Sequence, residues 1–132
     1  MSEAATILVV DDLPANRELM TRRLERSGFR VLSAASGPEA LELLRRSPVD
    51  LVLLDIMMPG MTGLDVLKTL RVSRATAALP VIMVTAKTDS EDVVEALSLG
   101  ANDYVTKPVD YPVALARIQQ HLQVRQRAPE PA

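Results

Sequence analysis

Leu51-Val-Leu-Leu-Asp-Ile-Met-Met-Pro-Gly60 contains an unbroken apolar run that ends in a carboxylate and a turn. Four consecutive aliphatic residues at 51–54 are typical of a strand that is covered on both faces, as in a parallel sheet. Asp55 follows this run directly, and the loop after it is dense in proline and glycine. An ionised carboxylate beside so much apolar surface is costly unless it is paired or bound to a metal. We therefore expect Asp55 to be a functional residue at the end of a central strand.

The rest of the chain repeats this alternation of a short apolar run with an amphipathic segment. The apolar runs predict strands at 6–10, 30–34, 51–54, 81–85 and 103–106. The segments between and after them predict helices at 14–27, 38–47, 64–73, 90–99 and 111–125. Because right-handed crossovers place helices on both faces of a parallel sheet, this pattern predicts an α/β fold. We expect a (βα)5 doubly wound, flavodoxin-like five-stranded parallel sheet with strand order 2-1-3-4-5, in which the more polar strand at 30–34 lies at an edge.

Residues at the predicted helix ends support these boundaries. Pro14 fits the first turn of its helix, where the N–H that proline lacks would have no partner in any case. Ser36 and Ser90 are candidate N-caps. Gly28 and Gly100 fit the positions that follow a helix, where glycine is favoured.

Charged and hydroxyl side chains gather at the carboxyl ends of the predicted strands. In an open parallel sheet these ends share one edge, which is where ligands bind. We therefore expect one cluster made of Asp11, Asp12, Asp55 and Lys107, with Thr85 beside it as a hydroxyl donor. Three neighbouring carboxylates repel one another, and Mg²⁺ relieves that repulsion through oxygen ligands.

Such a set of groups suits phosphoryl transfer, in which a protein mainly positions groups and neutralises charge. A carboxylate can act as the nucleophile and become an aspartyl phosphate. We expect Asp55 to take that role because it ends the central strand, while Asp11 and Asp12 hold the metal. Taken alone, Asp11-Asp12 also fits an ordinary helix N-cap, Lys107 a solvated surface residue and Tyr104 a partly buried aromatic.

Composition limits the classes of function. The chain has 132 residues, which fits one domain, and its net charge of -2 argues against direct nucleic-acid binding, which needs a basic face. It has no cysteine, which excludes disulfides and thiolate sites, and its only histidine is His121. The amino terminus lacks a signal peptide or a membrane span, so we expect a cytoplasmic protein with no membrane contact. We further expect Met57 to fill a gap in the core, and Arg23 and His121 to be exposed.

In chain order, Val9-Val-Asp-Asp12, Leu54-Asp-Ile-Met-Met-Pro-Gly60 with Gly63, Val84-Thr-Ala86 and Gly100-Ala-Asn-Asp-Tyr-Val-Thr-Lys-Pro108 resemble the response-regulator receiver domain of two-component signalling. The resemblance covers about residues 5–125. It implies a phosphorylation-dependent switch rather than an enzyme, with Asp55 accepting a phosphoryl group from a sensor histidine kinase, a histidine phosphotransfer protein or a small phosphodonor.

The resemblance also implies a role for each site residue. Asp12, Asp55 and the Met57 backbone carbonyl would hold Mg²⁺ (or Mn²⁺), with Asp11 acting through water. The phosphoryl group would be bound by Thr85, by Lys107 and by the backbone N–H groups of Met57 and Ala86. The Lys107–Pro108 bond would be cis, as is usual in the family. Thr85 and Tyr104 would form the switch that changes the face made by helix 90–99, strand 103–106 and helix 111–125.

Some features depart from the family pattern or leave alternatives open. Val109 stands where phenylalanine is common, and Met57 and Lys87 occupy positions that tune the lifetime of the phosphoryl group. We expect a receiver domain at 4–125, with 126–132 as a flexible tail or the start of a linker to an output domain. The switch would act on a partner, on a fused output domain or through phosphorylation-dependent homodimerisation.

Two other classes of function remain as alternatives. The first is a Mg²⁺-dependent phosphohydrolase of the haloacid-dehalogenase type, which usually carries a second aspartate two residues after the nucleophile, where this chain has Met57. The second is a flavodoxin-like cofactor binder, but the first strand–helix loop lacks the phosphate cradle that such a protein needs.

Overall fold

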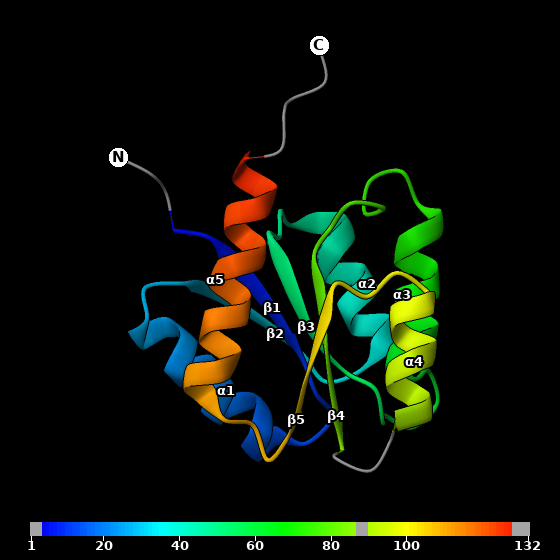
Figure 1. Cartoon of the computed structure of the whole chain (residues 1–132), viewed down its shortest axis with the longest axis horizontal. Helices are drawn as coiled ribbons and strands as arrows, with labels where there is room; N and C mark the ends of the chain where they lie inside the picture. The colour runs from blue at the N-terminus through cyan, green and yellow to red at the C-terminus, as the bar shows by residue number, and fades with distance from the viewer. Residues whose placement is uncertain (1–3, 87–89, 128–132) are drawn as a thin grey trace.

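A computed structural model describes residues 4–86 and 90–127 of the chain as one five-stranded sheet with helices on both faces (Figure 1). The strands are β1 (Thr6–Val10), β2 (Arg30–Ala34), β3 (Leu51–Asp55), β4 (Val81–Ala86) and β5 (Asp103–Lys107). The helices are α1 (Pro14–Arg26), α2 (Gly37–Arg46), α3 (Gly63–Val72), α4 (Ser90–Ser98) and α5 (Tyr111–Arg127). The tail at 128–132 and Lys87 lie outside the described residues.

The strand order is β2-β1-β3-β4-β5, and every neighbouring pair is parallel. This confirms the predicted doubly wound, flavodoxin-like (βα)5 fold and the edge position of β2. All strand and helix boundaries agree with the predicted ones to within two residues. Within the described ranges, no helix is both long and apolar enough to cross a bilayer.

Each face of the sheet has its own core, because the strand residues are apolar on both sides. Along β3, Val52 and Leu54 join the core under α2, α3 and α4, whereas Leu51 and Leu53 join the core under α1 and α5. Figure 1 shows α1 and α5 together on one side of the sheet and the other three helices on the opposite side. The carboxyl ends of the strands are therefore bordered by two separate helix layers.

The structure confirms the predicted starts of α1 and α2, whereas Ser90, predicted as an N-cap, is the first residue of α4 and the residue before it lies outside the described ranges. Pro14 occupies the first turn of α1, and the Ser36 side chain accepts a hydrogen bond from the Glu39 N–H at the start of α2. A capping box begins α3, in which the Thr62 and Asp65 side chains each accept from the other's backbone N–H. This motif fixes where α3 starts and hence the length of the loop after Asp55.

Three side chains differ from the expectations based on sequence. Met57 is 63% exposed, because the chain leaves the sheet after β3 and Met58 is the residue that enters the core. The Arg23 guanidinium lies 5.6 Å from the centre of the Tyr111 ring instead of in open solvent. The His121 side chain is only 18% exposed and pairs with Asp103, so the prediction of an exposed histidine was wrong.

Candidate functional site

Asp55 is held at the end of β3 by backbone contacts on two sides. The Ile56 N–H donates to the Val84 carbonyl at 3.1 Å and extends the β3–β4 ladder by one step. The Gly63 N–H donates to the Ile56 carbonyl at 2.9 Å and brings the start of α3 against the end of β3. A Cβ atom at Gly63 would overlap the Asp55 backbone oxygen. Glycine at 63 therefore allows the close approach that fixes the Asp55 backbone.

The Asp55 side chain is only 3% exposed and has two partners. The Lys107 Nζ lies 3.0 Å from Asp55 Oδ2, and the Met57 N–H donates to Asp55 Oδ1 at 3.3 Å. Burial raises the pKa of Asp55 and the nearby Asp11 charge raises it further, whereas Lys107 and the Met57 N–H lower it. The net direction is upward, so the ionised carboxylate is destabilised in its buried position despite its lysine partner.

Asp11 and Asp12 follow β1 and bring two more carboxylates to the same edge. Asp11 is 8% exposed, and its Oδ1 accepts a hydrogen bond from the Leu13 N–H at 2.9 Å. Its Oδ2 lies 3.9 Å from Lys107 Nζ. Asp11 thus orders the turn before α1 without being its N-cap, because Leu13 holds that position and makes no side-chain cap.

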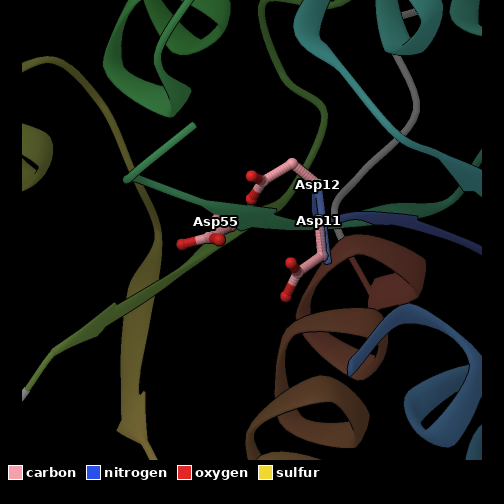
Figure 2. Close-up of side chains that lie close together, drawn as sticks. All are labelled: Asp11, Asp12 and Asp55. Carbon is pink, nitrogen blue, oxygen red and sulfur yellow. The ribbon is translucent and has the colours of Figure 1, made fainter. Parts of the chain in front are cut away.

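The three carboxylates lie around one small space at the ends of β1 and β3 (Figure 2). Asp11, Asp12 and Asp55 each offer an oxygen atom, and these atoms all lie within 4.8 Å of one another. An all-oxygen donor set with more negative than positive charge is suited to a hard divalent cation. The acidic cluster that the sequence predicted is confirmed as a cluster that could hold a metal ion.

Thr85 and Ala86 reach the same edge from β4. Thr85 is 1% exposed and pairs in register with Thr106, and Ala86 pairs in register with Lys107. The Thr85 Oγ1 is 3.4 Å from the Ala86 carbonyl, a long contact that leaves the hydroxyl weakly held. The Lys107–Pro108 peptide bond is cis, as the resemblance implied.

Tyr104 lies on β5 beside Met83 of β4 and packs against the core that contains Ala96 of α4. Side chains alternate between the faces of a strand, so Thr85 projects to the same side of the sheet as Met83. Thr85 and Tyr104 therefore share the face of the sheet that α4 covers.

An ionic network at the start of β5 was not predicted from the sequence. Asp103 Oδ1 accepts from Arg117 at 2.7 Å, and Asp103 Oδ2 lies 3.0 Å from His121 Nε2. Burial raises the pKa of Asp103, but the contacts with His121, the Tyr104 N–H and Arg117 outweigh it, so that the pKa lies below its ordinary value. The four-residue spacing of Arg117 and His121 places both on one face of α5, which is the signal that could have revealed the network.

Comparisons with known proteins agree with this geometry. The family model described as "Response regulator receiver domain" matches residues 7–119. The DNA-binding response regulator MtrA of Mycolicibacterium smegmatis is 46% identical over 96% of this chain and 53% of its own length. A probable cyclic di-GMP phosphodiesterase of Vibrio cholerae is 45% identical over 89% of this chain and 26% of its own length. The chain thus spans about a quarter to a half of the length of these curated relatives.

Solved structures of proteins of similar length have the same fold as this chain. A CheY-like response regulator receiver domain protein from Methanospirillum hungatei is 31% identical, with a TM-score of 0.89 and coverage of 96% of this chain and 100% of that one. The Vibrio cholerae chemotaxis protein CheY4 is also 31% identical, with a TM-score of 0.84 and coverage of 89% and 98%. The chain belongs to the response-regulator receiver domain family.

Proposed function

We propose that this chain is the receiver of a two-component system and that Asp55 accepts its phosphoryl group. The observation that carries the proposal is one nearly buried carboxylate with an ammonium 3.0 Å away and two further carboxylates around the same space. Family membership makes the role regulatory, and it makes a phosphohistidine on a sensor histidine kinase or a histidine phosphotransfer protein the natural donor. A small phosphodonor such as acetyl phosphate would serve the same site.

The chemistry is a displacement at phosphorus. An Asp55 oxygen forms the new P–O bond while the P–N bond of the donor phosphohistidine breaks, and the released imidazole takes up a proton. Lys107 lies where it can pair with a phosphoryl oxygen, since it already contacts Asp55 Oδ2. The backbone N–H groups of Met57 and Ala86 and the Thr85 hydroxyl would donate to the other oxygens.

The donor set at this edge fits Mg²⁺ (or Mn²⁺). Asp12, Asp55 and the Met57 backbone carbonyl would hold the ion directly, and Asp11 would act through water, because its Oδ1 already accepts from the Leu13 N–H. When bound, the ion neutralises the charge that the phosphoryl oxygens add to three carboxylates.

The output would be a population shift on the face formed by α4, β5 and α5. The phosphoryl group adds negative charge and strong acceptor oxygens next to Thr85, which shares the α4 side of the sheet with Tyr104. Moving a two-state population from 1:99 to 99:1 takes about 5.5 kcal/mol of differential stabilisation. The receiving surface carries exposed apolar side chains, Val94 (65%) and Leu97 (45%) on α4 and Val113 (44%) on α5. These side chains could contact a partner, a fused output domain or a second copy of the chain.

The domain boundary follows from the same proposal. We place the receiver at 4–125 and regard 126–132, of which residues 126–127 still belong to α5, as a tail or the start of a linker. Support comes from the relatives, which are about two to four times as long as the part that this chain matches. Because the proposed donor is a kinase that uses ATP, we also place the protein in the cytoplasm.

Phosphoryl uptake from acetyl phosphate with Mg²⁺, followed by intact-protein mass spectrometry, tests the acceptor. We expect the wild type to gain one phosphoryl mass and Asp55→Asn to gain none. Asp110→Asn is the matched control, because it makes the same chemical change at an exposed carboxylate whose weak cap to the Val113 N–H an asparagine can replace. Uptake by Asp55→Asn at the wild-type level would refute the assignment.

The output face is tested separately by size-exclusion chromatography with and without beryllofluoride and Mg²⁺. If α4, β5 and α5 mediate a phosphorylation-dependent dimer, beryllofluoride shifts the elution volume and Leu97→Glu abolishes the shift. An elution volume that does not respond to beryllofluoride would contradict the homodimer but leave Asp55 as the acceptor.

A further inference from the structure

A cavity of about 450 Å³ lies on the α1 and α5 side of the sheet and borders the acidic cluster, with Asp11 and Lys107 lining both. Its size falls in the range of pockets that bind small organic molecules. Apolar residues of the sheet, of α1 and of the loop after β5 form most of the wall, and they include Val9, Leu53, Val84, Leu19, Met20 and Val109. Valine at 109 is small, and this leaves room between α1 and the loop.

The charged residues that line the cavity differ in whether they already have a partner of opposite charge. Lys107 is committed to Asp55 at 3.0 Å and Asp11 at 3.9 Å, and Asp11 also accepts from the Leu13 N–H. Arg23 lines the cavity as well. In residues 4–86 and 90–127, no ion pair with a carboxylate includes Arg23. The one charge on this wall without an opposite partner is therefore positive.

The position of Arg23 is fixed by contacts between α1 and α5. The Tyr111 hydroxyl donates to the Arg23 carbonyl at 3.0 Å and also lies 2.8 Å from the Ser27 hydroxyl. The Arg23 guanidinium lies over the Tyr111 ring at 5.6 Å, which restrains a side chain that would otherwise be free. A ligand in the cavity would thus meet a guanidinium that is largely preorganised, which lowers the entropy cost of binding.

We propose that this cavity binds a small apolar monocarboxylate, with its hydrocarbon or aryl body against the valine, leucine and methionine wall and its carboxylate on Arg23. An arginine guanidinium matches a carboxylate in planar, two-point geometry, and a neutral head group would gain less there. The bound molecule would also lie beside Lys107 and Asp11, so the cavity and the acceptor site share two residues. Binding itself does not depend on phosphorylation and is tested without it.

The experiment is an NMR titration of the full chain with 4-phenylbutyrate and, separately, with 4-phenylbutyramide, which keeps the shape and lacks the charge. We expect saturable shifts of the backbone amides at 9–11, 16–23, 107 and 109. We also expect a roughly tenfold tighter dissociation constant for the acid, which is the difference expected when a hydrogen bond gains a charged partner. Arg23→Gln should remove the preference for the acid, because it weakens binding of the acid about tenfold more than binding of the amide.

Arg26→Gln is the matched control, because Arg26 is exposed on the same helix and does not line the cavity, and it should retain the tenfold preference. Val109→Phe should weaken both probes by filling the space, and a thermal melt shows whether that variant is folded. Equal affinity for acid and amide, an unchanged preference in Arg23→Gln, or shifts centred elsewhere would overturn the proposal. Shifts of the same amides on raising the protein concentration without a probe would also overturn it, since a second copy would then fill the cavity.

Discussion

Replacing Gly63 with alanine tests how the start of α3 positions Asp55, the proposed phosphoacceptor. The added Cβ would overlap the Asp55 backbone oxygen and lie 2.8 Å from the Ile56 Cα. Both atoms belong to the backbone at the end of a central strand, so neither can move like the end of a flexible side chain. We expect Gly63→Ala to push α3 away from β3 and to strain the 2.9 Å hydrogen bond from the residue 63 N–H to the Ile56 carbonyl.

The size of the effect follows from three terms, two that destabilise the fold and one that opposes them. Forcing an extra methyl group into a packed site typically costs about 1–3 kcal/mol. Weakening the hydrogen bond destabilises the fold by about 0.5–1.5 kcal/mol more. The higher helix propensity of alanine stabilises the fold by up to about 1 kcal/mol. The net loss is about 2 kcal/mol in the free energy of unfolding. With a specific unfolding entropy of about 2.1 cal/mol/K per residue, a chain of this size should lose roughly 7 °C in Tm.

Differential scanning calorimetry measures the loss, and Gly37→Ala is the matched control. Gly37 is also a buried glycine at the first residue of a helix, but the three atoms nearest to a Cβ there belong to the side chains of Met61 and Val66. The flexible Met61 side chain can move aside, so we expect less than half of the Tm loss.

Phosphoryl uptake from acetyl phosphate is the second measurement for this pair of variants. A displacement of about 1 Å at a reacting group can lower a rate by about 100-fold. Gly63→Ala should therefore slow uptake strongly, whereas Gly37→Ala should not. An unchanged Tm together with wild-type uptake in Gly63→Ala would refute the claim that close packing of α3 on β3 positions Asp55.

Three further predictions concern the charges of the site. Burial raises the folded-state pKa of Asp55 above its ordinary value of 3.8, so the contribution of Asp55 to stability is complete below pH 3.8 and is lost as the pH rises through the folded-state pKa. In EDTA, urea denaturation should therefore show that the free energy of unfolding of the wild type decreases relative to that of Asp55→Asn as the pH increases. Parallel pH profiles of the two proteins would contradict this. Mg²⁺ should raise the Tm of the wild type by mass action, and Asp12→Asn should lose most of that increase; an equal increase in both proteins would place the ion elsewhere. Lys107→Ala should remain folded by circular dichroism. If beryllofluoride shifts the elution volume of the wild type, it should not shift that of Lys107→Ala. A normal shift in this variant would exclude a role for Lys107 in coupling the acceptor site to dimerisation.

The fold and the acidic cluster could be predicted because both follow from local sequence features. Uninterrupted aliphatic runs specify strands that are covered on both faces, and the parallel topology then brings the residues after each strand to one edge. Asp11 and Asp55 are far apart in the sequence, yet β1 and β3 are neighbours in the predicted strand order. No knowledge of side-chain conformations is needed to bring them together.

Contacts between helices and strands could not be predicted in the same way. Asp103 pairs with His121 and Arg117 because α5 crosses β5 at a particular angle and height, and hydrophobic periodicity does not specify either. The packing of Arg23 on Tyr111 depends in the same way on how α1 lies beside α5. Residues that looked like solvated positions on single helices therefore became half-buried partners once two elements met.

The raised pKa of Asp55 connects the packing of the site with its proposed response. Burial and the Asp11 charge destabilise the ionised carboxylate, and the single ammonium of Lys107 does not fully compensate for them. A bound cation would lower this cost, and under the proposed function a phosphoryl group on Asp55 would offer charged acceptor oxygens to Lys107 and to the weakly held Thr85 hydroxyl. Cation binding and phosphorylation would therefore both change the contacts of the same buried carboxylate. A phosphoryl group can shift a conformational equilibrium only if its contacts differ between the two conformations. Lys107 and Thr85 lie between the two helix layers, where such a difference in contacts would affect both.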